Sequence, residues 1–305
     1  MKVLLFGGRG QVGWQLRRSL SLLGEVVVAE RQGTPCCGDL LQPAAIRDAI
    51  LALRPQAVVN AAAYTAVDRA EDEPELAFAI NARACEAMAE ACTQAGCWLV
   101  HYSSDYVYRG DGAGPWRETD PCEPLGVYGK SKLQGDLAVA TTPRHLILRT
   151  SWVFETWGGN FLKSILKAAR DRDELSVVSD QWGAPTRAAL IADVTALALR
   201  QLRQDPDAMA RAGVYHLAGA GETNWHAYAC FAIEQAAAAG LPLRARSSQV
   251  RAISTADYAA RAPRPANSRL DTTRLRSGFG IHLPPWQDGV SAVVAELARQ
   301  ALAAS

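Results

Sequence analysis

Residues 2–13, Lys-Val-Leu-Leu-Phe-Gly-Gly-Arg-Gly-Gln-Val-Gly, decide the fold of this 305-residue chain. Residues 2–6 are mostly apolar and predict a short buried strand, and the apolar spacing over 11–23 predicts a helix. Gly7, Gly10 and Gly13 fall between the two elements, where a backbone without Cβ atoms can turn tightly and approach a pyrophosphate at the helix N-terminus. Glycines also serve tight turns for steric reasons alone, but their place after the first strand favours a dinucleotide-binding unit.

Strand and helix patterns alternate through the first half of the chain. The runs that predict strands are 26–29, 57–60, 98–103 and 145–149, and the helical patterns are 43–53, 74–95 and 127–140. This alternation predicts an α/β fold, with a parallel sheet that helices cover on both faces. Right-handed crossovers make such a sheet a Rossmann-type, doubly wound, nucleotide-binding domain.

The second half is less regular and predicts a second, smaller α/β lobe. Helices are expected at 160–172, 188–203 and 224–239, and a strand at 214–217. We expect residues 1–150 plus about 188–217 to form the NAD(P)-binding domain. The substrate domain is then expected to consist of about 151–185 plus 219–305.

Composition argues against several kinds of partner. The chain has 32 Lys and Arg against 31 Asp and Glu, so its net charge gives no electrostatic reason to bind nucleic acid or an anionic membrane. No apolar run approaches the roughly 20 residues of a membrane span, so we expect a cytoplasmic protein with a small-molecule substrate. Seven cysteines without a Cys-x-x-Cys pair predict free thiols and no metal site.

Cofactor contacts are expected where the predicted strands end. Glu30 closes the second strand and can accept hydrogen bonds from ribose hydroxyls, whereas the Arg31 guanidinium attracts a ribose 2′-phosphate. The pair leaves the choice between NADH and NADPH open. Asp39 could accept a hydrogen bond from the adenine amino group, and either it or the small residues after the third strand could instead form plain turns.

Tyr128 and Lys132 are four residues apart, one turn apart on the predicted helix. A neighbouring cation stabilises phenolate and is expected to lower the tyrosine pKa from about 10. Ser104 closes the fourth strand, at the edge where open α/β sheets bind ligands. The three side chains predict a hydride-transfer site in which Tyr128 protonates the developing alkoxide and Lys132 binds the nicotinamide ribose.

Seven segments along the chain carry a family resemblance. They are Phe-Gly-Gly-Arg-Gly-Gln-Val-Gly-Trp (6–14), Val-Val-Asn-Ala-Ala-Ala-Tyr-Thr-Ala-Val-Asp (58–68), Ser-Ser-Asp-Tyr-Val-Tyr (103–108), Val-Tyr-Gly-Lys-Ser-Lys (127–132), Arg-Thr-Ser-Trp-Val-Phe (149–154), Gln-Trp-Gly-Ala-Pro-Thr (181–186) and Arg-Pro-Ala-Asn-Ser-Arg-Leu (264–270). In this order they resemble the extended short-chain dehydrogenase/reductases, and more closely the dTDP-4-dehydrorhamnose reductases. The resemblance implies hydride transfer from NADPH or NADH to the 4-keto group of dTDP-4-dehydro-L-rhamnose. That reaction is the last step of dTDP-L-rhamnose synthesis, which supplies O antigen or other cell-surface polysaccharides.

The resemblance also implies a set of site residues. The catalytic residues would be Tyr128, Lys132 and Ser104. Besides Tyr128 and Lys132, the cofactor would contact Gly7, Gly10, Gln11, Val12, Gly13, Glu30, Arg31, Asp39, Leu40, Ala61, Ala62, Ala63, Tyr64 and Thr65. The substrate would contact Ser104, Asp105, Tyr106, Tyr128 and Trp152, with Asn160, Arg264, Asn267 and Arg269 as candidates for its nucleotide part.

Three positions depart from the family pattern. Ser104 stands where members usually carry Thr, but both supply a hydroxyl. Tyr64 replaces a common His, which changes little if the backbone binds the cofactor. Some relatives use a Glu to hold Mg²⁺ at a dimer contact where this chain has Gln15, and an amide is a poorer ligand for a hard cation. Mg²⁺ binding and a homodimer therefore stay open.

Other members of the superfamily have different signatures. Nucleotide-sugar dehydratases carry an Asp-Glu pair after the hydroxyl residue of the fourth strand, and here Asp105 is followed by Tyr106. Fucose-type epimerase-reductases place a Cys near the position of Asp105. A non-catalytic alternative is a binding subunit, because the regulatory subunit of methionine adenosyltransferase is similar to this family. The intact Tyr128, Lys132 and Ser104 favour a reductase.

Overall fold

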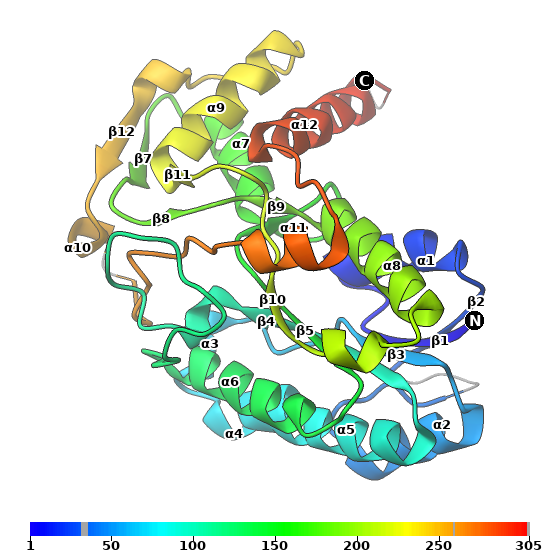
Figure 1. Cartoon of the computed structure of the whole chain (residues 1–305). Helices are drawn as coiled ribbons and strands as arrows, with labels where there is room; N and C mark the ends of the chain where they lie inside the picture. Colours follow the sequence, from blue (N-terminus) through cyan, green and yellow to red (C-terminus); the bar gives the residue numbers. More distant parts are fainter. Residues whose placement is uncertain (32–35, 259, 304–305) are drawn as a thin grey trace.

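The computed structural model describes residues 1–31, 36–258 and 260–303, with a parallel sheet at its centre (Figure 1). Its strands, in the order in which they lie side by side, are β10 (Gly213–His216), β5 (His145–Thr150), β4 (Trp98–Ser104), β3 (Ala57–Asn60), β1 (Lys2–Phe6) and β2 (Glu25–Ala29). All neighbouring strands are parallel. The strand order changes direction between β1 and β3, which opens a crevice at the carboxyl edge of the sheet. The predicted α/β Rossmann-type class is confirmed.

Two layers of helices cover the sheet, and the strands alternate side chains between them (Figure 1). Val3 and Leu5 pack with one layer, and Leu4 and Phe6 pack with the other. Because both faces are covered, the strands read as mainly apolar runs rather than as an alternation of apolar and polar residues. The first layer is α1 (Gln11–Ser21) and α8 (Ala188–Gln204), and the second is α2 (Pro43–Leu53), α5 (Ala84–Ala95) and α6 (Val127–Ala140).

The helix predicted over 74–95 contains a π-helical turn. The chain forms α4 (Pro74–Phe78), then the π turn Ala79–Arg83, then α5. The extra residue of the turn directs the Asn81 side chain inward, where it accepts the Tyr64 N–H at 2.9 Å and donates to Ser131 Oγ at 3.0 Å. The Tyr64 phenol donates to Glu73, the residue before α4, at 2.6 Å. The π turn therefore ties the loop after β3 to the helix that carries Tyr128.

A second hydrophobic core lies beyond the carboxyl edge of the sheet. Its buried residues include Phe154, Leu162, Tyr228, Ile233 and Val290, and all members of this core come from the segment 152–297. The elements of this part are β6 (Val153–Phe154), α7 (Phe161–Asp171), β7 (Leu175–Val178), β8 (Trp182–Gly183), β9 (Thr186–Arg187), β11 (Thr223–Asn224), α9 (Trp225–Ala238), β12 (Val250–Ile253), α10 (Thr255–Tyr258) and α12 (Trp286–Ala303). β7 pairs with β12, and β8 with β11. The domain boundaries predicted above stay a prediction.

The sequence patterns did not indicate several elements. They are α3 (Val67–Ala70), α11 (Thr273–Phe279), α12 and the two-residue strands, most of which are too short to show a period. Within the described ranges, no helix is long and apolar enough to cross a membrane. The seven cysteines, all in the described part of the chain, are free thiols.

Candidate active site

The glycine turn forms a cradle at the start of α1. Gly7 has φ +77°, and a Cβ there would lie 2.5 Å from the backbone of Ala61 and Ala62. A Cβ on Gly13 would collide with the Gly7 carbonyl oxygen. Gly10 caps α1 without a side-chain hydrogen bond, and the first-turn N–H groups of a helix have no partner within it. The turn therefore fits a pyrophosphate, which would accept hydrogen bonds from these N–H groups.

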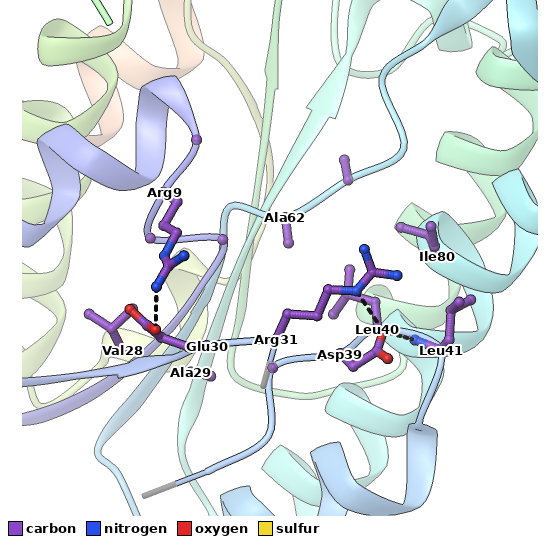
Figure 2. Close-up of a pocket in the computed structure, with 15 residues that line it drawn as sticks. Arg9, Val28, Ala29, Glu30, Arg31, Asp39, Leu40, Leu41, Ala62 and Ile80 are labelled. Atoms are coloured by element: carbon purple, nitrogen blue, oxygen red, sulfur yellow. Dashed lines mark hydrogen bonds and ion pairs between the residues drawn. The ribbon is translucent and has the colours of Figure 1, made fainter. Parts of the chain in front are cut away.

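A cavity of about 580 Å³, the first cavity, opens beside this turn at the carboxyl ends of β1, β2 and β3 (Figure 2). The predicted cofactor residues that line it are Gly7, Gly10, Glu30, Arg31, Asp39, Leu40, Ala62 and Ala63. Lining residues that were not predicted are Gly8, Arg9, Val28, Ala29, Gly38, Leu41 and Ile80. Six other predicted cofactor residues do not line the cavity, although they lie close in sequence to residues that do: Gln11, Val12, Gly13, Ala61, Tyr64 and Thr65.

Two guanidinium groups face the first cavity, each beside a carboxylate (Figure 2). Arg9 Nη2 lies 2.5 Å from Glu30 Oε2, and Arg31 Nε lies 3.7 Å from Asp39 Oδ1. Both arginine side chains are more than 70% exposed, at 78% and 75%, so a ligand can reach them. Arg9 therefore offsets the negative charge of Glu30. The sequence had indicated only Arg31 as a cation beside Glu30.

Helix α6 presents Tyr128 in its first turn, and three contacts fix that turn. Glu71 Oε1 accepts the Val127 N–H at 2.9 Å, and Ser131 Oγ donates to the Tyr128 carbonyl at 2.8 Å. Gly129 lets the helix approach the strand-four loop, because a Cβ there would collide with the Tyr106 carbonyl oxygen. The phenol of Tyr128 is thereby held against the carboxyl end of β4.

Ser104, Asp105 and Tyr106 surround the Tyr128 ring. The Tyr106 and Tyr128 rings meet edge to face, with centroids 5.4 Å apart. Burial raises the pKa of Tyr128 above its ordinary value, and a hydrogen bond to Ser104 opposes that shift. The expected lowering of this pKa by the Lys132 cation does not occur, because burial dominates and the charged groups that act on Tyr128 are acidic. A phenol with a raised pKa stays protonated at neutral pH and can act as an acid.

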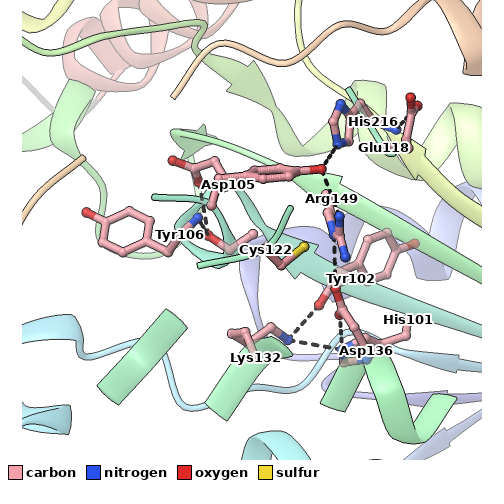
Figure 3. A network of polar contacts seen from close by, with 12 residues as sticks. His101, Tyr102, Asp105, Tyr106, Glu118, Cys122, Lys132, Asp136, Arg149 and His216 are labelled. Atoms are coloured by element: carbon pink, nitrogen blue, oxygen red, sulfur yellow. Dashed lines mark hydrogen bonds and ion pairs between the residues drawn. The ribbon is translucent and has the colours of Figure 1, made fainter. Parts of the chain in front are cut away.

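Lys132 lies one turn beyond Tyr128 and is buried. Its Nζ donates to the Tyr102 carbonyl at 2.7 Å and lies 3.2 Å from His101 Nε2, both on β4 (Figure 3). Burial lowers the pKa of Lys132, and Cys85 and Asp136 oppose this.

A second cavity, of about 450 Å³, lies on the other side of Tyr106. Its aromatic lining residues are Tyr106, Phe161, Trp225 and Tyr258, and its charged one is Arg264. Asn160 and Asn224 cap α7 and α9 and so place the first residue of each helix, Phe161 and Trp225, in the wall. Aromatic faces with a guanidinium fit a planar base joined to phosphates.

The other predicted substrate residues lie near the second cavity or outside it. Trp152 stacks on Trp225, with centroids 3.7 Å apart, and has φ +48°, a strained conformation for a non-glycine residue. Asn160 donates to Gln11 Oε1 at 2.8 Å and so joins α7 to α1. Asn267 donates to the Gly114 carbonyl at 2.8 Å, and its Oδ1 accepts from Arg269 Nε at 2.9 Å. Asn160, Asn267 and Arg269 therefore hold neighbouring segments of the chain together.

Some residues of both cavities were missed at the sequence level. Arg9 lies within the glycine-rich stretch 7–13, and a cation at that place could have been predicted to contact the cofactor phosphates. Phe161, Trp225 and Tyr258 come from three separate helices, and nothing in their local sequence indicates that they meet. Gln15 lies on α1, and no group of three His, Cys, Asp or Glu within residues 1–31, 36–258 and 260–303 is arranged to hold a metal ion.

Asp105 should make the stability of the protein depend on pH. Burial raises its pKa to about 6, against about 3.9 in an unfolded chain. The folded state then binds more protons than the unfolded state between these values, so the free energy of unfolding falls as pH rises through that window. Asp105→Asn should therefore stabilise the protein by about 3 kcal/mol at pH 8 and by about half of that at pH 5. Urea unfolding at both pH values measures the difference, and an equal effect at both would contradict it.

A glycine cradle on a doubly wound sheet and a Tyr-x-x-x-Lys pair beside a strand-four hydroxyl occur together in this chain. The combination defines an NAD(P)-dependent oxidoreductase of the short-chain dehydrogenase/reductase class. The family model described as the RmlD substrate binding domain matches residues 1–299. The chain belongs to that family.

Known proteins agree with this assignment over nearly the whole chain. The dTDP-4-dehydrorhamnose reductase of Escherichia coli K12 is 46% identical over 298 residues, which cover 97% of this chain and 98% of that one. The crystal structure of a dTDP-4-dehydrorhamnose reductase from Clostridium acetobutylicum superposes with a TM-score of 0.87 at 29% identity, covering 97% and 99% of the two chains. The enzyme of that name from Bacillus anthracis, solved in complex with NADP, gives 0.83 at 29% identity, with the same coverage.

Proposed function

We propose that the protein reduces the 4-keto group of dTDP-4-dehydro-L-rhamnose with NADPH or NADH, giving dTDP-L-rhamnose. The observation that carries the proposal is that Tyr128 lies against Ser104 at the carboxyl end of β4, with Lys132 one turn further along α6 and with Tyr106, which contacts the Tyr128 ring, lining the second cavity. The first cavity fits a dinucleotide and the second fits an aromatic base with phosphates. The names of the relatives at 44–46% identity support the same reaction.

The residues of the chain have separate tasks in this reaction. The nicotinamide supplies the hydride when it is bound. Tyr128 gives its proton to the oxygen of the former ketone, and it can do so at neutral pH because a phenol is protonated there and is a much stronger acid than the alcohol that forms. Ser104 donates a hydrogen bond to the same oxygen and so holds it near the phenol. Lys132 binds the ribose next to the nicotinamide.

The dTDP group of the substrate is assigned to the second cavity. Phe161, Trp225 and Tyr258 supply faces on which the thymine ring can stack. Arg264 supplies charge for the diphosphate, with its guanidinium held by Asp68 at 2.6 Å. Trp152, stacked on Trp225, would contact the sugar between the two cavities.

Either nicotinamide cofactor fits the adenosine end of the first cavity. Glu30 can accept hydrogen bonds from the ribose hydroxyls of NADH, while Arg9 and Arg31 can pair with the 2′-phosphate of NADPH. The cytoplasmic location, the homodimer, Mg²⁺ binding and the division into two domains stay predictions.

Arg31→Gln should separate the two cofactors. Loss of one guanidinium near the 2′-phosphate is expected to raise the KM for NADPH about tenfold, which is about 1.4 kcal/mol, and to change the KM for NADH less than about twofold. Arg47→Gln is the matched control, because Arg47 pairs with Glu90 on the outer helices and is not a lining residue of the first cavity. Equal changes for both cofactors would rule out this role for Arg31.

The proposed reaction is tested by following the oxidation of NADPH and of NADH at 340 nm. Oxidation should require the 4-keto-6-deoxy-L-sugar nucleotide and should not occur with dTDP-glucose. A protein that binds the cofactor but oxidises neither form in the presence of the keto sugar would be a binding subunit and not a reductase.

A further inference from the structure

The buried surroundings of Lys132 contain two titratable side chains to which the reaction assigns no role. They are His101 on β4 and Asp136 on α6, and both are buried (Figure 3). Asp136 follows Lys132 by one helical turn, so the two side chains leave α6 on the same face. Along α6, Asp136 lies on the far side of Lys132 from Tyr128.

His101 contacts Lys132 directly. Lys132 Nζ and His101 Nε2 are 3.2 Å apart, and an ammonium has only hydrogens to offer. Burial and the Lys132 charge hold the pKa of His101 well below its ordinary value, so the imidazole is neutral. Its Nε2 then accepts from the ammonium, and the ring proton sits on Nδ1, 3.8 Å from Cys85 Sγ, which can accept it. The Asn60 amide nitrogen, a donor, is directed to the same sulfur at 3.5 Å.

Asp136 is influenced by two cations, Arg149 and Lys132. Its Oδ2 accepts from Arg149 Nε at 3.0 Å, and Arg149 in turn donates to the Tyr108 hydroxyl at 2.7 Å. Its Oδ1 lies 3.8 Å from His101 Nε2 and makes no hydrogen bond of good geometry within the described chain. One oxygen of the carboxylate therefore accepts from Arg149, and the other lies beside His101, close enough to Lys132 for the two charges to affect each other.

We infer that His101 and Asp136 are positioning residues, which hold the Lys132 side chain on β4 and keep its amine protonated in a buried site. A buried amine loses its proton easily unless a counter-charge is near. Asp136 is the counter-charge, and the His101 imidazole with the Tyr102 carbonyl fixes the direction of Nζ. The inference concerns the state of Lys132 and rests on the proposed function only for what Lys132 binds.

Few other ionisable groups around Lys132 could produce the same effect. The remaining ones are Cys85 on α5, Tyr128 on α6 and Arg149 on β5. Burial raises the pKa of the Cys85 thiol to about 11, and it raises that of Tyr128 as well, so both are neutral at assay pH. Arg149 is a cation and would favour the neutral amine. Among these groups only Asp136 supplies negative charge.

The test is the titration of Lys132 by NMR in the cofactor-free protein. The chain has five lysines, so ¹³Cε-labelled lysine gives few signals, and the signal lost in Lys132→Arg identifies Lys132. In Asp136→Asn the titration midpoint of this signal should fall by about 1 pH unit or more. The alkaline limb of the kcat profile should move to lower pH by the same amount. An unchanged midpoint would overturn the inference whether or not the protein reduces the keto sugar.

Three further variants separate this role from a structural one. Glu155→Gln removes another buried carboxylate that pairs with an arginine, Arg187, so it should lower thermal stability without moving the Lys132 midpoint. His101→Leu removes the acceptor but leaves Asp136 paired with Arg149, which covers the case that Asp136→Asn does not fold. It should lower the midpoint too, whereas His101→Gln, which keeps an acceptor, should restore much of it. A midpoint that stays in place in His101→Leu would contradict the part assigned to His101.

Discussion

Tyr128→Phe is expected to lower kcat by about 10²–10⁴-fold and to leave the Kd for NADPH within about a factor of three of the wild-type value. The substitution removes the proton that the reduced oxygen needs and keeps the ring that packs against Tyr106. Because the hydroxyl takes part only in the chemical step, the loss should appear in kcat rather than in cofactor binding. Stopped-flow single turnovers and calorimetric titration with NADPH measure the two quantities separately.

Tyr106→Phe is the control for this prediction. It removes a second phenol from the same cluster, one that hydrogen-bonds Arg264 and lines the second cavity. We expect it to raise the KM for the sugar nucleotide, with a kcat effect far smaller than that of Tyr128→Phe. A Tyr128→Phe enzyme with wild-type turnover, or a Tyr106→Phe enzyme with the larger loss of kcat, would remove Tyr128 from the role of acid.

Gly7→Ala is expected to have the largest effect on folding and on cofactor binding. A residue with φ +77° is strained by a Cβ, at about 1–2 kcal/mol, and this Cβ would also lie 2.5 Å from the loop after β3. Overpacking of that kind costs about 1–3 kcal/mol more. The displaced turn should also weaken NADPH binding at least about tenfold, since the cradle depends on close approach of backbone atoms.

Gly96→Ala separates the two parts of this effect. Gly96 has φ +68° at the end of α5, and a Cβ there meets nothing within 4 Å. Its variant should lose only the strain energy, and its affinity for NADPH should not change. Urea unfolding and NADPH titration of both variants make the comparison, and equal losses in the two would show that the contact with Ala61 and Ala62 is unimportant.

The sequence predicted the parts of the fold that carry a long periodic signal. The helices at 43–53 and 127–140 begin and end where they were expected, and all six sheet strands were located to within a residue at each end. The π turn at Ala79–Arg83 could not be predicted, because it shifts a helical register without changing its composition. The two-residue strands of the second lobe are fixed by pairing with distant segments, which a local pattern does not contain.

The site was predictable to the extent that its residues fall at the ends of strands. Glu30, Asp39, Ala62 and Ala63 reach the first cavity because the carboxyl ends of parallel strands share one edge. The wall of the second cavity could not be predicted, since its aromatic residues meet only after three helices pack. The electrostatics of Tyr128 also needed the structure, because the amount of burial decides the direction of its pKa shift.

The position of the transferred hydride tests the proposed reaction most directly. The protein should be incubated with dTDP-4-dehydro-L-rhamnose and NADPH deuterated at C4 of the nicotinamide, using each of the two stereospecifically labelled forms. One form should give dTDP-L-rhamnose with deuterium at C4 of the sugar, seen by NMR and mass spectrometry, and the other should give unlabelled product. Absence of dTDP-L-rhamnose, or deuterium at another carbon, would contradict the account.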